Sequence, residues 1–198
     1  MGELPVMETF YTIQGEGYYA GYPAYFIRLG GCDIGCHWCD VKESWDSEMH
    51  PKKTVTEIVS NIPEQVKLAV ITGGEPCMYD LTILTQELKK REIQTNLETS
   101  GAYEIMGDFD WICLSPKKRK LPLDSSLQKA NELKVVIYNQ DDFNFAEFFG
   151  SKITDSCKRF LQVEWSKRET MMQNIIDYSL ANPQWAISVQ IHKYLKIR

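Results

Sequence analysis

Residues 24–40 read A-Y-F-I-R-L-G-G-C-D-I-G-C-H-W-C-D, and they connect the expected fold of this chain to its expected chemistry. The first six residues are mostly apolar or aromatic and predict a strand. That strand leads straight into a loop with three cysteines, Cys32, Cys36 and Cys39. The sequence thus places three thiols together at the end of a predicted strand.

Three thiols are one fewer than a closed metal site requires. A [4Fe–4S] cluster is normally held by four cysteines, and structural zinc also takes four ligands. Three cysteines therefore leave one iron open to a small molecule. We expect Cys32, Cys36 and Cys39 to bind a [4Fe–4S] cluster, with Trp38 shielding it or lying against a flat ligand.

Cysteines this close together could instead form a disulfide or bind zinc. A disulfide belongs to an oxidising compartment, but the N-terminus, M-G-E-L-P-V-M-E, lacks the basic and apolar regions of a signal peptide. No stretch reaches the length of a membrane span, so we expect a cytoplasmic protein that binds no membrane. Zinc is the stronger rival, with His37 as a fourth ligand. The scattered Cys77, Cys113 and Cys157 are expected in the core.

The composition predicts one globular domain over residues 1–198. Hydrophobic residues make up 43% of the chain and charged residues 25%, and the net charge is -5. An acidic chain lacks the charge of a protein that binds nucleic-acid backbones, so no nucleic acid is expected. The one basic run, K-K-R-K at residues 117–120, is interpreted mostly as a solvated loop, and His50 as a surface residue.

Strand-like and helix-like segments alternate along the chain. T-V-T-E at residues 54–57 forms a capping box that opens a helix to about residue 62. Further helices are expected at residues 80–91, 141–149 and 169–181, and strands at residues 24–29, 67–72, 93–99, 110–115, 133–138, 159–163 and 185–190.

This order predicts an α/β fold in which helices cover a parallel sheet of six or seven strands. A closed eight-stranded barrel needs roughly 250 residues, so we expect a partial, open TIM-like barrel. Polar motifs follow four of the strands: G-G-C, T-G-G-E-P, E-T-S-G and S-P-K. Carboxyl ends of parallel strands share one rim, so these motifs should converge there.

The T-G-G-E-P motif at residues 72–76 suits the amino-acid end of a small ligand. Its two glycines allow close approach to the backbone, and Glu75 could face an ammonium group. An ordinary strand-to-helix turn is the alternative interpretation. Together with the C-x-x-x-C-x-x-C loop, however, the motif resembles the radical S-adenosylmethionine enzymes. The resemblance implies that the open iron chelates S-adenosylmethionine, whose cleavage yields a 5′-deoxyadenosyl radical.

The two ends of the chain narrow the resemblance. T-I-Q-G-E-G at residues 12–17 and H-K-Y-L at residues 192–195, with the motifs above, resemble the 7-carboxy-7-deazaguanine synthase family over essentially the whole chain. That family converts 6-carboxy-5,6,7,8-tetrahydropterin to 7-carboxy-7-deazaguanine and releases ammonia. The product enters queuosine and related 7-deazapurine pathways.

The resemblance implies two sets of site residues. Residues expected along S-adenosylmethionine are Trp38, Cys39, Asp40, Gly74, Ser100, Ser115, Pro116, Lys117, Gln162, Val163, Glu164 and Trp165. Residues expected at the pterin are Ile13, Gln14, Gly15, Glu16, Arg28, Thr72, Glu98, His192 and Arg198. Within this set, Gln14 and Glu16 suit the ring edge, and the Arg28 guanidinium suits the substrate carboxylate.

One position departs from the family pattern. Family members often carry Thr or Ser after the Cys-Asp pair as a ligand of Mg²⁺, but this chain has Val41. An isopropyl group cannot ligate a hard cation. Mg²⁺ is therefore an open cofactor with no protein ligand assigned, although Asp40 or water could fill the position.

The sequence also permits two alternative functions: a glycyl-radical-enzyme activase, since such enzymes also carry T-I-Q-G-E-G, and a zinc-stabilised binding module. For the leading interpretation, the partners implied are an external electron donor of flavodoxin or ferredoxin type and a second copy of the chain in a homodimer.

Overall fold

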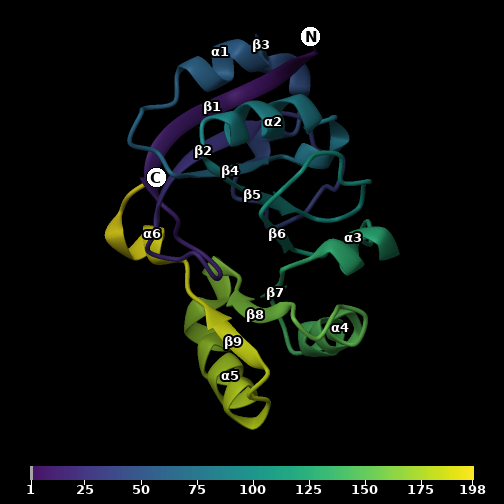
Figure 1. The fold of residues 1–198 in the computed structure, drawn as a ribbon. Helices are drawn as coiled ribbons and strands as arrows, with labels where there is room; N and C mark the ends of the chain where they lie inside the picture. Colours follow the sequence, from purple (N-terminus) through teal and green to yellow (C-terminus); the bar gives the residue numbers. More distant parts are fainter. Residues whose placement is uncertain (1) are drawn as a thin grey trace.

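A computed structural model, which describes residues 2–198, folds around one curved sheet of nine strands (Figure 1). The strands follow each other across the sheet in the order β3-β1-β2-β4-β5-β6-β7-β8-β9. Their bounds are β1 Glu3–Ile13, β2 Pro23–Leu29, β3 Lys52–Thr54, β4 Leu68–Gly73, β5 Gln94–Thr99, β6 Trp111–Leu114, β7 Glu132–Ile137, β8 Lys158–Val163 and β9 Trp185–Ser188.

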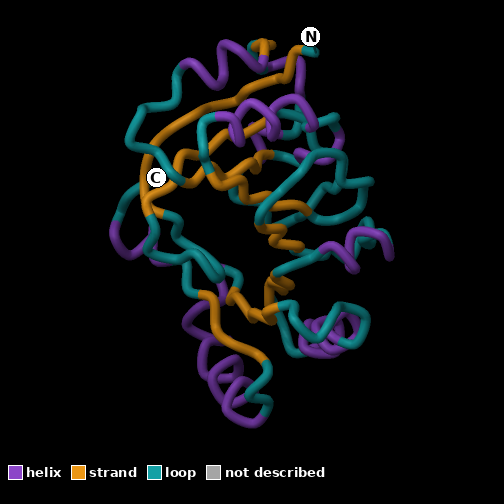
Figure 2. The backbone as a smooth tube through the Cα atoms, viewed as in Figure 1, coloured by secondary structure: helices purple, strands orange, loops and turns teal. Residues whose placement is uncertain are grey.

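The seven strands from β2 to β9, leaving out β3, are all parallel. β1 pairs antiparallel with β2 and β3. The sheet curves into an open barrel with its helices outside (Figure 2). The C-terminus lies beside β1 in Figure 1, where Thr12 Oγ1 donates to the carbonyl of Arg198 at 3.2 Å.

Six α-helices cover the outer face and one end of the sheet. Their bounds are α1 Val55–Ser60, α2 Thr82–Lys90, α3 Asp124–Lys129, α4 Asp141–Gly150, α5 Arg168–Ala181 and α6 Ile191–Leu195. The expected capping box opens α1: Thr54 Oγ1 accepts from Glu57 N at 3.3 Å, and the Glu57 carboxylate accepts from Thr54 N at 2.7 Å.

The core lies between the helices and the outward side chains of the strands. One cluster packs β1, β2, β4 and β5 against α1 and α2, with Ile27, Ile71 and Leu97 fully buried. A second packs β7, β8 and β9 against α3, α4 and α5 around Leu133 and Trp185. Because the helices remove these apolar side chains from water, the inward face of the sheet is free to carry polar groups.

The expected open barrel of parallel strands is confirmed, but the sequence reading missed four elements. β1 already contains Phe10–Ile13, so the T-I-Q-G-E-G motif begins within a strand rather than before the first one. β3, α3 and α6 are each six residues or shorter. Short elements such as β3 produce too few turns or alternations to show a period. β1 has 11 residues, but its buried residues are consecutive rather than alternating, so it shows no period of two.

The expected burial of Cys77, Cys113 and Cys157 is confirmed. His50, expected at the surface, is instead partly buried. Its Nε2 lies 2.9 Å from the Glu43 carbonyl, and its ring packs on Gly30 so closely that a Cβ there would lie 2.2 Å from it. Among the described helices, none combines the length and the apolarity needed to cross a membrane.

A truncation in β5 tests the packing. Leu97→Ala removes a fully buried side chain beneath α2 and should lower the free energy of unfolding by about 2–5 kcal/mol. The matched control is Leu180→Ala on α5, where the side chain is 79% exposed and the expected change is within about 0.5 kcal/mol. Denaturant unfolding of both variants measures the difference, and equal losses would contradict the described core.

Candidate active site

A cavity of about 300 Å³ lies inside the open barrel. Successive side chains of a strand point to opposite faces of a sheet. In β7, Leu133, Val135 and Ile137 belong to the outer core, whereas Lys134 and Val136 line the cavity. In the same way Arg28 of β2, Thr72 of β4 and Glu98 of β5 point inward. The strand alternation therefore builds the cavity wall.

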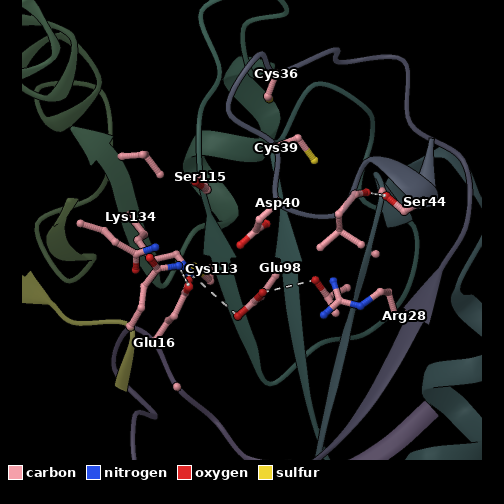
Figure 3. Close-up of a pocket in the computed structure, with 18 of the residues that line it drawn as sticks. Glu16, Arg28, Cys36, Cys39, Asp40, Ser44, Glu98, Cys113, Ser115 and Lys134 are labelled. Atoms are coloured by element: carbon pink, nitrogen blue, oxygen red, sulfur yellow. Dashed lines mark hydrogen bonds and ion pairs between the residues drawn. The ribbon is translucent and has the colours of Figure 1, made fainter. Parts of the chain in front are cut away.

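The three-cysteine loop forms one end of this cavity (Figure 3). Cys32, Cys36 and Cys39 are free, half-buried thiols that line it. Backbone bonds hold the start of the loop: Cys32 N donates to the Trp45 carbonyl at 3.0 Å, and Gly31 N donates to the Ser44 carbonyl at 2.6 Å. The loop is thus fixed to the barrel at the side that carries its thiols.

Across residues 2–198, no group of three or more His, Cys, Asp or Glu side chains is gathered closely enough to hold one metal ion. The donor set nevertheless fits an iron–sulfur cluster, because three thiols of one loop face a single cavity. Cys113, which also lines the cavity, lies on β6 near Glu132, away from the loop (Figure 3).

Glu75 joins three strand-end loops. Its buried carboxylate accepts from Thr99 Oγ1 at 2.5 Å, from Ser100 N at 2.8 Å and from Cys77 N at 3.0 Å. Its own backbone N donates to the Gly31 carbonyl at 2.8 Å. This carboxylate therefore holds the loop after β5 in place. Glu75 also lines the cavity, so its expected position near a ligand ammonium stays a prediction.

The two glycines before Glu75 permit close packing of T-G-G-E on the cysteine loop. Gly73 has φ +145°, and a Cβ there would lie 2.2 Å from the Leu29 carbonyl oxygen. A Cβ at Gly74 would lie 2.3 Å from the Gly31 oxygen. Glycine is required at both positions because any side chain would push the two loops apart.

The other end of the cavity carries paired charges. Lys134 Nζ lies 2.5 Å from Glu16 Oε2, and Glu98 Oε1 accepts from Gln14 Nε2 at 3.0 Å. Thr72 Oγ1 donates to Glu98 Oε2 at 3.3 Å. These groups come from β4, β5, β7 and the segment after β1, so distant parts of the sequence share one polar floor.

Three residues expected at the pterin, Arg28, His192 and Arg198, lie at the open side of the cavity. Arg28 Nε donates to Glu8 Oε1 at 2.9 Å in a salt bridge, and Arg28 also lines the cavity. Arg198 Nη2 lies 3.6 Å from the second Glu8 oxygen. His192 packs on Gly15, where a Cβ would lie 2.1 Å from Nδ1. The C-terminal segment thus covers the T-I-Q-G-E-G motif.

Within the basic run at residues 117–120, Lys117 lines the cavity, whereas Lys118 and Arg119 are exposed, as expected for most of the run. Lys117 Nζ donates to Ser115 Oγ at 2.7 Å and lies 5.6 Å from the Trp38 ring centroid. Burial lowers the pKa of Lys117. Arg119 Nη1 donates to the Gly35 carbonyl at 2.8 Å, within the cysteine loop.

The cavity brings together every predicted site residue except Pro116. Those that line it are Ile13, Gln14, Gly15, Glu16, Arg28, Cys32, Cys36, Trp38, Cys39, Asp40, Thr72, Gly74, Glu98, Ser100, Ser115, Lys117, Gln162, Val163, Glu164, Trp165, His192 and Arg198. Pro116 is buried behind this wall. Lining a common cavity does not assign a ligand to each residue, so the division between cofactor and substrate stays a prediction.

Sequence reasoning missed Cys113, Lys134, Gln190 and Lys193, which also line the cavity. Lys134 carried a usable signal, because a lysine within E-L-K-V-V-I interrupts an otherwise apolar strand. Cys113 carried no such signal, because an isolated cysteine in a strand is as easily a small core residue as a site residue. Gln190 and Lys193 depend on the placement of α6, which the sequence reading did not foresee.

Comparisons with known proteins agree with this geometry. Residues 26–112 match the Radical SAM superfamily. The 7-carboxy-7-deazaguanine synthase of Flavobacterium psychrophilum is 56% identical, covering 98% of this chain and 92% of that protein. The Escherichia coli synthase is 32% identical, covering 98% and 99%. The crystal structure of QueE from Escherichia coli matches with a TM-score of 0.86 at 31% identity, covering 95% of this chain and 94% of that chain.

The open barrel and its three-cysteine cavity define a radical S-adenosylmethionine enzyme, and this class implies a [4Fe–4S] cluster and S-adenosylmethionine as cofactors. Within the class, the chain belongs to the 7-carboxy-7-deazaguanine synthase family. This assignment argues against both the glycyl-radical activase and the zinc-stabilised module.

Glu75 provides a test of how the loops are held. Glu75→Gln replaces an acceptor oxygen with an NH₂ group, which would face one of the donors now bonded to the carboxylate. We expect a loss of about 1–3 kcal/mol in the free energy of unfolding and weaker S-adenosylmethionine binding by the reconstituted protein. The control Glu64→Gln changes an exposed carboxylate. If Glu75→Gln bound S-adenosylmethionine as wild type does, cofactor binding would not depend on the loops that Glu75 holds, and the prediction would be wrong.

Proposed function

We propose that this enzyme converts 6-carboxy-5,6,7,8-tetrahydropterin to 7-carboxy-7-deazaguanine with release of ammonia, on the route to queuosine and related 7-deazapurines. The observation that carries the proposal is a single cavity with a three-cysteine loop at one end and a floor of paired charges at the other. The relatives named 7-carboxy-7-deazaguanine synthase support this substrate and product.

Cys32, Cys36 and Cys39 would hold the cluster, which with S-adenosylmethionine supplies a 5′-deoxyadenosyl radical that abstracts hydrogen from the substrate. The chain positions the cofactor and excludes water. Gly74 leaves room for its amino-acid end, and Trp38 and Lys117 lie along the same wall. On the far side, Gln162, Val163, Glu164 and Trp165 would contact the adenine. A radical formed here is shielded because the barrel surrounds it.

The polar floor would bind the pterin ring, and the open side its carboxylate. Gln14, Glu16 and Glu98 offer an amide and two carboxylates to the donors and acceptors of an aminopyrimidinone. Arg28 uses its Nε to bond Glu8, and its Nη groups make no hydrogen bond within the described residues, so they could pair with the substrate carboxylate. Ile13, Gly15 and Thr72 would contact the ring, and His192 and Arg198 would close the pocket.

Four further assignments are part of the proposal. Residues 1–198 are taken as one domain, because one sheet includes strands from both ends of the chain. The cytoplasm is the proposed location, since all six cysteines are free.

An external flavodoxin or ferredoxin would reduce the cluster. A homodimer would cover apolar surface such as Tyr194 and Leu195, which are exposed on α6.

The direct test uses protein reconstituted with iron and sulfide without oxygen, then reduced and incubated with S-adenosylmethionine and the carboxypterin. We expect 7-carboxy-7-deazaguanine by mass and 5′-deoxyadenosine formation that depends on the pterin. Cys36→Ala should abolish both, because it removes one thiol of the proposed cluster site. Arg28→Ala should lose turnover but keep the cluster and S-adenosylmethionine binding. Product formation by Cys36→Ala would contradict the proposal, and so would a wild-type enzyme that does not turn over the carboxypterin.

We also propose that any Mg²⁺ in this enzyme binds weakly. Val41 lines the cavity at the position where the sequence resemblance implies an oxygen ligand. The nearby Asp40 carboxylate is 62% exposed and lies 3.3 Å from Lys193. The Ser44 hydroxyl donates to the Val41 carbonyl at 2.7 Å. Oxygen donors therefore exist around the position, but Val41 itself contributes no side-chain ligand.

Val41→Thr tests the metal assignment by adding the missing hydroxyl. We expect the Mg²⁺ concentration that gives half-maximal turnover to fall by about tenfold, because one more oxygen ligand is supplied. Val41→Ala, which adds no oxygen, is the control for changed packing. If neither Mg²⁺ nor a chelator changes the turnover rate of wild type or of Val41→Thr, this site uses no metal.

A further inference from the structure

Lys134 is a buried lysine in the middle of β7, on the floor of the cavity. Its side chain is 6% exposed and points inward, toward Glu16 (Figure 3). A buried ammonium is costly unless it is paired. Nothing in the motifs that identify the family includes Lys134, and its presence in a core strand therefore calls for a physical reason.

The partners of Lys134 are residues of the cavity itself. Its Nζ lies 2.5 Å from Glu16 Oε2 and 4.0 Å from Glu98 Oε1. Glu16 Oε1 accepts from Gln190 Nε2 at 2.7 Å, so the carboxylate is held from both sides. The ammonium therefore restrains Glu16 and lies next to a second carboxylate of the proposed pterin site.

Other titratable groups surround this pair. Glu132 lies on the same strand, two residues away, and accepts from Trp111 Nε1 at 3.0 Å. Cys113 of β6 approaches Glu132, and His192 of α6 faces Glu16. Burial raises the pKa of both Glu132 and Cys113. Lys134 is thus the main positive charge among several acidic groups.

The charge of Lys134 acts most strongly on Glu16. Burial alone would raise the pKa of Glu16, but the ion pair and hydrogen bond with Lys134, with Gln190 and His192, bring that pKa down to about 2. Burial would conversely lower the pKa of Lys134, but Glu16 and the other acidic groups raise it well above its usual value. Both partners therefore stay charged near neutral pH.

Folding stability alone does not explain a buried ion pair, because well-packed apolar residues at the same positions often stabilise a protein equally well. This one lies where a ligand is expected, with both partners on the cavity wall. A fixed carboxylate can only accept hydrogen bonds, whereas a protonated Glu16 would also donate one. The protonation state of Glu16 therefore decides which edge of the ligand ring can hydrogen-bond to it.

We propose that Lys134 is a positioning residue for the pterin: its ammonium fixes Glu16 as an ionised acceptor, so that the floor selects a ring edge carrying N–H donors. This inference rests on the proposed function. Lys134 acts through Glu16 and need not touch the substrate. The ligand chemistry that fits is an aminopyrimidinone whose amino and ring N–H groups face the carboxylates.

The test compares wild type with Lys134→Met, which keeps the length of the side chain but removes its charge. We expect the dissociation constant of the carboxypterin to rise about tenfold or more, with S-adenosylmethionine binding and cluster absorption unchanged. Lys134→Arg, which keeps the charge, should recover part of the affinity. The control is Lys158→Met, on the exposed start of β8.

The pH profile separates positioning from simple structural support. Without Lys134, burial still raises the pKa of Glu16, so protonation should begin at higher pH. Between about pH 8 and pH 5, pterin affinity of Lys134→Met should fall toward the acid side more steeply than that of wild type. His192 faces Glu16 in both proteins, so its contribution is common to both profiles and the difference reports on Lys134.

A double variant keeps the inference falsifiable if Lys134→Met folds poorly. Glu16→Gln with Lys134→Met removes the charge of both partners of the closest ion pair. If Lys134 acts through Glu16, adding Lys134→Met to Glu16→Gln should change pterin affinity by less than about threefold. Additive losses, or a Lys134→Met protein that binds pterin as wild type does, would overturn the inference. A wild type inactive on the pterin would instead overturn the proposed function.

Discussion

The alternation of side chains along parallel strands is the constraint on which this molecule depends. Each strand from β4 to β8 has one face against the helices and one toward the barrel interior. The outward apolar residues supply the hydrophobic stabilisation, so the inward positions need not contribute to it. Arg28, Glu98 and Lys134 can therefore occupy core strands. A shift of one residue in register would exchange these polar groups with the apolar core.

The loops at the carboxyl ends of the strands convert this cavity into a site. Gly73 and Gly74 let T-G-G-E pack directly on the cysteine loop, and Glu75 ties that unit to Ser100 after β5. A carboxylate with several backbone and hydroxyl donors is held firmly, because each buried donor would otherwise lack a partner. The three thiols are thereby kept on the same wall as the residues expected to hold S-adenosylmethionine.

The opposite end of the cavity is held by charge. Glu16, from the segment after β1, reaches Lys134 on β7 and Gln190 just before α6. These contacts join the two ends of the chain across the floor of the barrel. Polar interactions between residues of the proposed substrate site therefore hold the barrel together at this side. The same interactions set the charge that a ligand would meet.

The sequence alone determined the class of fold and the chemistry of the site, because strand periodicity and the motifs at strand ends are local properties. The three cysteines, T-G-G-E-P and E-T-S-G could all be located without coordinates. Tertiary structure alone decided that Glu75 serves the loops, that α6 covers Gly15, and that Lys134 pairs with Glu16. The last two residues are 118 positions apart. Their pairing depends on strand order and sheet curvature, which no local pattern encodes.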